Sequence, residues 1–230
     1  MKSGVQIPPP LPDLIIVFKN IKKFHGKPII NYSIEALIKT KLFDKIHVST
    51  DSIQFTKLIK KNFSLDTDFL RPKSLSNHKT PIFEVLKYVH KEYKRRGVYS
   101  DEIFMLTPIS PLIDSSDIKK AFNNFHSQKI KSPIISVSEF AVPFEFSYTI
   151  NKKKMLVPVH KRDITRDSKS LITRYFDTGN FAIFEPDHLF KNKLLDIYLK
   201  FKPYILPKNK SIDIDDMEDW SIALKLFSKK

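Results

Sequence analysis

The sequence predicts an α/β fold built on an open sheet, and two observations carry this prediction. First, residues 19–51 combine a basic turn, an amphipathic helix and a short apolar strand with a polar end. That order is typical of one repeating unit of such a sheet. Second, short apolar strands are predicted at residues 102–106 and 134–138, with a helix over residues 118–125 between them. The 230 residues are enough for one domain with a normal core.

The first unit also predicts where a ligand would bind. The helix shows apolar residues at helical spacing, namely Ile30, Ile34, Leu37 and Ile38. The strand over residues 45–48 is followed by the polar run Ser49, Thr50 and Asp51. Ligands of open α/β sheets bind beyond the carboxyl ends of strands. The basic turn and the polar strand end are therefore expected to face one crevice.

Composition narrows the function classes. The net charge of +15 favours a polyanionic ligand, either a nucleoside triphosphate or a nucleic acid, although lysine-rich composition alone would also produce it. Zero cysteines exclude disulfides, thiolate metal sites and cysteine nucleophiles. No apolar run approaches the roughly 20 residues of a membrane span. No signal-peptide pattern is present, so a cytoplasmic protein is expected.

Two acidic residues near the end of the chain form the pattern of a metal site. Asp213 and Asp215 alternate with Ile212 and Ile214, so on a strand both carboxylates would point to one side. Paired oxygen ligands suit a Mg²⁺ ion carried by a triphosphate. We therefore predict Mg²⁺ as cofactor. The acidic residues 216–219 are instead interpreted as the start of a helix, whose dipole favours them.

Four motifs stand out in the chain, namely KNIKKFHGKPII, YSIEA and LFDKIHVSTDS in residues 19–52, and DIDDMEDW in residues 213–220. They resemble motifs of the CMP-sugar synthetases, which are the acylneuraminate cytidylyltransferases and their pseudaminate and legionaminate relatives. The resemblance spans residues 19–227. It implies a single domain over residues 1–230 with a three-layer, Rossmann-like, mostly parallel sheet of the nucleotide-diphospho-sugar transferase type. It also implies the reaction of CTP with a nine-carbon sugar acid to give a CMP-sugar and pyrophosphate.

Residues 1–18 depart from the resembled family. The family has there a buried strand and a loop rich in Arg, Gly, Ser and Lys that wraps the triphosphate. This chain has clustered prolines, which a central strand cannot hold, and an apolar run. The segment is interpreted as atypical and as a candidate for disorder. Two explanations stay open: a degenerate phosphate loop in a weak or inactive enzyme, or a local slip of the reading frame that ends before Lys19.

The resemblance implies nucleotide-binding residues in two stretches. Lys19, Asn20 and Lys27 are the polar residues that remain in the phosphate loop, and Lys19 is grouped with the two aspartates as catalytic; Lys27 could instead shield the entry of the helix. Arg71 and Thr80 bound a segment that resembles RPxxLSxDxT. Arg71 would clamp a phosphate or a base edge through its planar guanidinium. The simpler interpretations are a surface ion pair for Arg71 and a helix N-cap for Thr80.

The sugar side of the site is implied by three further stretches. Thr107 replaces a Gln in a segment similar to LQPTSPLR, and Arg166 takes the place of an Arg that meets the sugar carboxylate. Glu145 is a candidate for a sugar hydroxyl. Residues 175–179, YFDTG, resemble the pseudaminate motif Tyr-His-Asp-Ala-Gly more than the sialate one. The resemblance also implies that residues 140–177 project as a dimerisation and sugar-binding insertion in a homodimer.

Two other functions stay open at this point. The chain could be a catalytically impaired homologue that folds but does not hold CTP. It could also be a basic protein that binds anions or nucleic acid, although no motif of a nucleic-acid reader accompanies the charge.

Overall fold

A computed structural model describes residues 19–65, 67–191 and 193–228. Both explanations offered for residues 1–18 concern a segment outside this described part. Among the described residues, no helix has the length and apolar character needed to cross a membrane.

The centre of the molecule is a sheet of four strands in the order β3, β7, β4, β8. The strands are β3 (Ile103–Leu106), β4 (Ile134–Glu139), β7 (Tyr175–Phe184) and β8 (Lys202–Ile205). β4 pairs in parallel with β8, and β7 runs antiparallel to both β3 and β4. Three strands therefore share one direction, which confirms the mostly parallel sheet.

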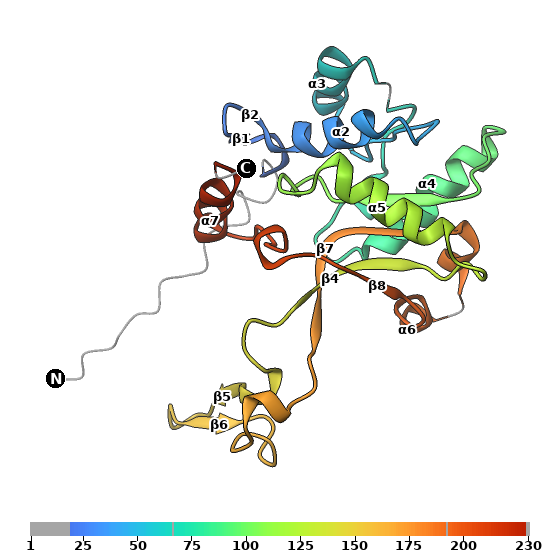
Figure 1. The fold of residues 1–230 in the computed structure, drawn as a ribbon. Coiled ribbons are helices and arrows are strands. Elements are labelled where there is room, and N and C mark those ends of the chain that lie inside the picture. The colour runs from blue at the N-terminus through green and yellow to red at the C-terminus, as the bar shows by residue number, and fades with distance from the viewer. Residues whose placement is uncertain (1–18, 66, 192, 229–230) are drawn as a thin grey trace.

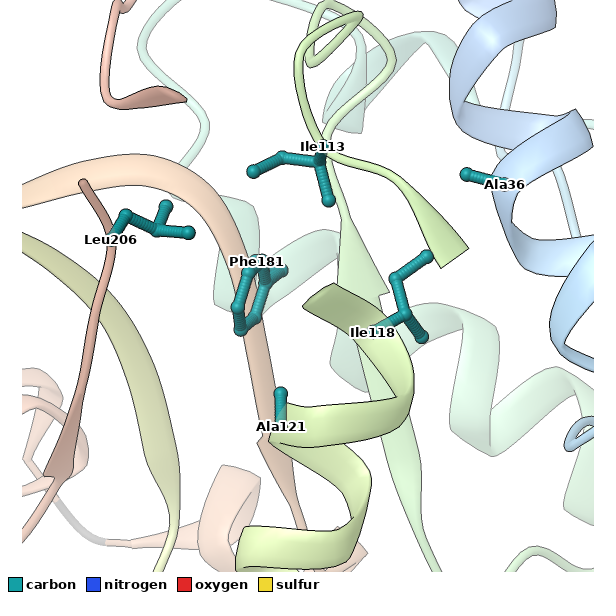
Figure 2. Packing of buried hydrophobic residues seen from close by; sticks show 6 residues of the cluster. All are labelled: Ala36, Ile113, Ile118, Ala121, Phe181 and Leu206. Atoms are coloured by element: carbon teal, nitrogen blue, oxygen red, sulfur yellow. The ribbon is translucent and has the colours of Figure 1, made fainter. Parts of the chain in front are cut away.

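Helices cover both faces of the sheet in three layers (Figure 1). They are α2 (Ile29–Thr40), α4 (Ile82–Arg95), α5 (Ser115–His126), η5 (Pro186–Phe190) and α6 (Leu194–Tyr198). Side chains of β7 alternate between the faces, as a strand requires. Phe181 belongs to a core cluster with residues of α2 and α5 (Figure 2), whereas Ala182 and Phe184 belong to a cluster with residues of α4, η5 and α6. The three-layer α/β architecture is confirmed.

A second core joins the start and the end of the described chain. The short strands β1 (Lys23–Phe24) and β2 (Lys27–Pro28) form a hairpin before α2, and α7 (Met217–Phe227) follows the last loop. Phe24 is fully buried, and its ring meets that of Trp220 edge-on at 5.4 Å between centroids. Ile29, Ile214 and Ala223 complete the cluster. The basic turn is therefore fixed against α7.

The helix of the first unit is confirmed, but its buried face is rotated from the predicted one. Ile30 and Ile34 are buried, while Ile38 is 42% exposed. Ser33 takes an inward position because its hydroxyl donates to the carbonyl of Thr107 at 3.1 Å. A satisfied hydrogen bond allows a polar side chain at this apolar interface.

The predicted strand over residues 45–48 was wrong for the part of the chain that the structure describes. Residues 45–50 belong to no strand of the described sheets, although α3 (Ile53–Phe63) follows them and Val48 packs against the cluster around Ile34 and Ile59. A backbone bond from Arg71 N to Thr50 O, at 2.7 Å, ties the segment to the next loop. The segment is thus apolar and packed without belonging to a described ladder.

Residues between β4 and β7 leave the sheet and project from the body of the molecule (Figure 1). This projection contains η3 (Phe144–Phe146), β5 (Tyr148–Ile150), β6 (Leu156–Pro158) and η4 (Ser168–Ser170). Large apolar side chains are exposed on it, among them Ile150 and Ile172. The dimerisation role of this insertion stays a prediction.

His47 forms the centre of a polar and aromatic cluster beneath α4. Its ring stacks on Phe69 at 4.7 Å between centroids, and its Nδ1 lies 2.9 Å from the Tyr93 hydroxyl. Tyr93 donates to Asp68 at 2.6 Å, and Lys45 pairs with the same carboxylate at 2.8 Å. Burial lowers the pKa of His47 to about 4, and the nearby Lys45 charge acts in the same direction while Asp68 opposes it.

This cluster predicts a pH-dependent stability. Unfolded His47 binds a proton near pH 6.5 and the folded form near pH 4, so the unfolded state holds more protons between these values. Stability therefore falls as pH falls through this window, by about 2 kcal/mol for His47 between pH 7 and pH 5. Urea unfolding of wild type and of His47→Phe, at both pH values, measures this difference.

The control for this prediction is His78→Phe, which changes an exposed histidine in the loop before α4. His78→Phe should keep the wild-type loss of stability between pH 7 and pH 5, whereas His47→Phe should reduce it. Equal losses in wild type and His47→Phe would contradict the role of His47.

Candidate active site

The candidate site is built around an irregularity in β7. Ile135 pairs with Ala182, but Val137 pairs with Asp177, so residues 178–181 of β7 lie opposite Ser136 alone. Gly179 lies within this bulge at φ +64°, in the left-handed region that glycine adopts at low cost. The Asp177 carboxylate accepts a hydrogen bond from Gly179 N at 2.8 Å and closes the turn. Bulges of this kind redirect side chains beside functional sites.

Ser136 supplies the hydrogen bonds that the bulge removes from the ladder. Its side chain is fully buried, and its Oγ donates to Phe181 O at 3.1 Å. The same oxygen accepts from Phe181 N at 3.0 Å and from Thr178 Oγ1 at 2.8 Å. Buried backbone groups need such partners, so this one hydroxyl stabilises the irregular backbone.

Asn180 connects the bulge to the predicted sugar residue Thr107. The carbonyl of Asn180 accepts from Thr107 N at 2.9 Å and from Thr107 Oγ1 at 3.3 Å. Thr107 Oγ1 also lies 2.6 Å from Ser110 Oγ in the turn after β3. The Asn180 side chain is buried, and its Nδ2 donates to the Lys210 carbonyl at 3.5 Å. Three segments far apart in the sequence therefore meet at Asn180.

The predicted metal ligands lie on the third of these segments. Asp213 Oδ2 is 3.8 Å from the position that a Cβ on Gly179 would occupy, so this carboxylate lies beside the bulge. Asp213 and Asp215 are exposed, while Ile214 between them is 1% exposed. Residues 211–215 do not form a strand, so that prediction was wrong. The predicted alternation of exposed aspartates around a buried Ile214 is nevertheless present.

These carboxylates fit a metal ion that arrives with its substrate. They offer hard oxygen ligands at an exposed position. Within the described residues, no group of three or more acidic or histidine side chains is arranged to hold a metal. Mg²⁺ commonly takes one or two carboxylates and completes its shell with water and substrate phosphates. The donor set therefore suits Mg²⁺ bound to a triphosphate.

The acidic run after these aspartates caps α7, as predicted. Asp216 is the N-cap and accepts from Glu218 N at 2.8 Å and Asp219 N at 2.9 Å. The Asp219 carboxylate in turn accepts from Asp215 N at 3.0 Å and from Asp216 N at 3.2 Å. This capping box fixes the backbone directly after Asp215.

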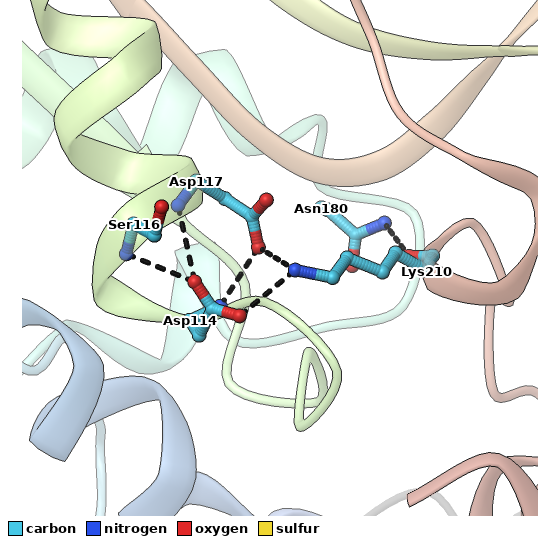
Figure 3. A network of polar contacts seen from close by, with 5 residues as sticks. All are labelled: Asp114, Ser116, Asp117, Asn180 and Lys210. Atoms are coloured by element: carbon cyan, nitrogen blue, oxygen red, sulfur yellow. Dashed lines mark hydrogen bonds and ion pairs between the residues drawn. The ribbon is translucent and has the colours of Figure 1, made fainter. Parts of the chain in front are cut away.

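Figure 3 shows a half-buried ion cluster that the sequence did not reveal, between Lys210 and two carboxylates. The Lys210 ammonium lies 2.8 Å from Asp114 Oδ2 and 2.6 Å from Asp117 Oδ2, both at the start of α5. Burial opposes the charge of Lys210, but the hydrogen bonds that its ammonium donates to both carboxylates raise its pKa above the ordinary value. Lys210 is one of 40 basic residues, and its sequence context does not distinguish it.

The predicted nucleotide residues fall into two places. Asn20, half-buried, lies with Lys19 in η1 (Lys19–Ile21), just before the β1–β2 hairpin. Lys27 forms an ion pair with Glu35 of α2, and its ammonium lies 4.2 Å from the centre of the Tyr32 ring. These contacts match the interpretation in which Lys27 shields the helix entry.

Arg71 and Thr80 bound the loop before α4. Arg71 Nε donates to Ser76 Oγ at 3.1 Å, so the guanidinium is held by its own loop. The interpretation of Thr80 as N-cap was wrong by one position, because Pro81 is the N-cap and no side chain caps that end. The loop itself is closed by Thr80 N donating to Asn77 O at 3.2 Å.

The other predicted sugar residues lie in the projection. Arg166 pairs with Asp163 at 3.0 Å and donates to Ser170 O at 3.2 Å. Glu145 is 3% exposed and accepts from Arg174 Nε at 2.7 Å, which lowers the pKa of the carboxyl. The structure therefore assigns Glu145 a local ion pair, while Thr107 and Asp213 belong to the sheet edge.

Comparison with known proteins identifies the family. The sequence model for Cytidylyltransferase matches residues 16–220. The chain belongs to this cytidylyltransferase family. It is 26% identical to a pseudaminic acid cytidylyltransferase of Campylobacter jejuni, over 91% of this chain and 89% of that protein. It is 28% identical to an N-acylneuraminate cytidylyltransferase of Escherichia coli, over 92% of this chain and 49% of that protein.

A solved structure supports the fold of this cytidylyltransferase. The chain is similar to a CMP:2-keto-3-deoxy-manno-octonic acid synthetase that was solved in complex with CTP. The TM-score is 0.65 at 12% identity, and 92% of each chain is covered. At this identity the similarity supports the α/β architecture alone.

Substitution of Ser136 tests whether its hydroxyl stabilises the bulge. Ser136→Ala leaves Phe181 N without its buried partner, which should cost about 1–3 kcal/mol of unfolding free energy. Ser138→Ala is the matched control, since Ser138 is equally buried and makes one bond, to Leu206 O at 3.2 Å. Urea denaturation should show the larger loss in Ser136→Ala. An equal or smaller loss would show that the Ser136 hydroxyl does not stabilise the bulge.

Proposed function

We propose that this cytidylyltransferase transfers the CMP group of CTP to a nonulosonic acid, with the pseudaminic type preferred, and releases pyrophosphate. The observation that carries the proposal is the exposed pair Asp213 and Asp215 beside the β7 bulge, next to the carboxyl end of β3. Open α/β sheets bind nucleotides at such an edge. The relatives named above favour this enzyme over an anion-binding or nucleic-acid-binding protein.

The chemistry is an in-line displacement at the α-phosphorus. The sugar hydroxyl attacks the phosphorus, the bond to the β-phosphate oxygen breaks, and pyrophosphate leaves. Such reactions depend on positioning and charge neutralisation more than on a covalent intermediate. Mg²⁺ held by Asp213 and Asp215 would neutralise the charge of the phosphates.

The remaining roles are those that the sequence resemblance implies. Lys19, Asn20 and Arg71 are proposed to bind the nucleotide, with weaker support for Lys27 and Thr80, which already serve local contacts. Thr107 is proposed to contact the sugar, because it lies at the β3 end beside Asn180. Arg166 is proposed to bind the sugar carboxylate. Use of CTP favours a cytoplasmic location.

The carboxylate pair gives the main test of function. Asp213→Asn and Asp215→Asn should each lower turnover by at least about 100-fold, because the metal ligands lose their charge. Each should also weaken binding of Mn²⁺ in the presence of CTP, measured by electron paramagnetic resonance. Asp44→Asn, an exposed aspartate in the loop after α2, is the control and should behave as wild type. Unchanged turnover and Mn²⁺ binding in both variants would refute the metal assignment.

We also propose a homodimer that forms through the projection. The exposed apolar side chains there would be buried against a second copy, as is usual for large apolar patches. Ile150→Asp should shift the protein to a monomer in sedimentation velocity. Ile130→Asp is the matched control, because Ile130 is 82% exposed but lies outside the projection. A wild-type monomer, or a dimer that persists in Ile150→Asp, would count against this interface.

A further inference from the structure

The Lys210 cluster connects a half-buried charge to the loop over residues 211–215, which carries Asp213 and Asp215. The Lys210 side chain is 20% exposed, and that of Asp117 is 10% exposed. Most of the basic residues lie on the surface, where ion pairs contribute little to stability. Here one ammonium contacts two carboxylates within 2.8 Å, in a half-buried position. This arrangement restrains the lysine far more than a surface pair would.

The carboxylates of Asp114 and Asp117 are also held by hydrogen bonds that do not involve Lys210. Asp114 Oδ1 accepts from Ser116 N at 2.9 Å and from Asp117 N at 3.1 Å. Asp117 Oδ2 accepts from Asp114 N at 3.0 Å, which completes a capping box. Capping boxes hold both side chains in one orientation. Lys210 is therefore attached to a rigid point on α5.

The backbone of Lys210 is equally constrained. Its N–H donates to Pro207 O at 2.8 Å within the turn η6 (Lys208–Lys210). Its carbonyl accepts from the Asn180 side chain, as described above. Ser211 follows, buried, with its hydroxyl donating to Lys208 O at 2.9 Å. The residue thus joins α5, the β7 bulge and the last loop.

Downstream of Lys210, the loop carries Asp213 and reaches its next anchor at Ile214. Ile214 lies in the core with Phe24 and Trp220. Asp213 therefore lies between two fixed points, the half-buried Lys210 and the buried Ile214. Three residues of extended chain span at most about 10 Å, so a fixed Lys210 restricts where the Asp213 carboxylate can lie.

We propose that Lys210 is a positioning residue that holds the 211–215 loop in place, so that Asp213 and Asp215 present their carboxylates beside Gly179. One part of this inference rests on the proposed function: that the ordered loop binds the metal–nucleotide complex more tightly. Its structural part, the ordering of the loop by Lys210, is independent of what the loop binds.

The experiment compares Lys210→Met, Lys210→Arg and Lys208→Met. Met keeps the length of the side chain and removes its charge, and Arg keeps the charge. Lys208 is an exposed lysine of the same turn, so it controls for the loss of one positive charge. Asp117→Asn is a second variant, which removes one partner charge but leaves an amide oxygen to accept from Asp114 N.

The first readout is hydrogen–deuterium exchange of peptides that cover residues 211–216, without any ligand. Lys210→Met and Asp117→Asn should raise exchange there by about tenfold, because local opening becomes easier. Lys208→Met should match wild type, and Lys210→Arg should fall between. The second readout is Mn²⁺ binding with CTP, which should weaken by about 10-fold to 100-fold in Lys210→Met, because loss of a group that orients metal ligands commonly costs this much affinity.

The outcomes separate this inference from the proposed function. Wild-type exchange over residues 211–216 in both Lys210→Met and Asp117→Asn would overturn the inference, and so would an increase spread equally over the whole chain. If exchange rises locally but wild type itself binds no Mn²⁺ with CTP, the positioning role stands and the proposed function is wrong. A local rise in exchange together with weakened Mn²⁺ binding in Lys210→Met supports both the inference and the proposed function.

Discussion

The structure depends most on one buried hydroxyl. Ser136 is the residue that allows β7 to keep pairing with β4 on both sides of the bulge, because its Oγ substitutes for the ladder bonds lost there. A shift of register in a strand changes which face its side chains meet, so the bulge decides what lies at the sheet edge. Asn180 can then bond Thr107 and the Lys210 carbonyl while Gly179 lies beside Asp213.

This arrangement explains how an irregular loop can present two carboxylates. A loop without a ladder gains order only from its anchors, and here they are of three kinds. Ile214 supplies apolar burial, Lys210 supplies a half-buried ion pair, and the Asp219 carboxylate accepts hydrogen bonds from Asp215 N and Asp216 N. Because the anchors belong to different parts of the chain, the carboxylate pair forms only when the whole fold is in place.

The sequence predicted the features that depend on local pattern and missed those that depend on register. Apolar spacing identified α2, β3 and β4, and the alternation around Ile214 placed both aspartates on the exposed side. A special conformation at Gly179 was predictable from the glycine itself, but the bulge was not, since its hydrogen bonds join Ser136 to Phe181, 45 residues away. The inward turn of Ser33 likewise depends on a carbonyl 74 residues away.

The chain is strongly basic overall, yet its candidate site carries two acidic side chains. The net charge of +15 gives a field that attracts polyanions from a distance, without specifying where they bind. At the site itself, Asp213 and Asp215 are negative, so they would repel a bare triphosphate at short range. A divalent cation carried by the phosphates reverses that sign, because the ion is the largest local charge in such a site. The overall basic charge and the acidic pair are therefore compatible when the ligand is a metal-bound nucleotide, and they conflict for a metal-free polyanion bound at the same position.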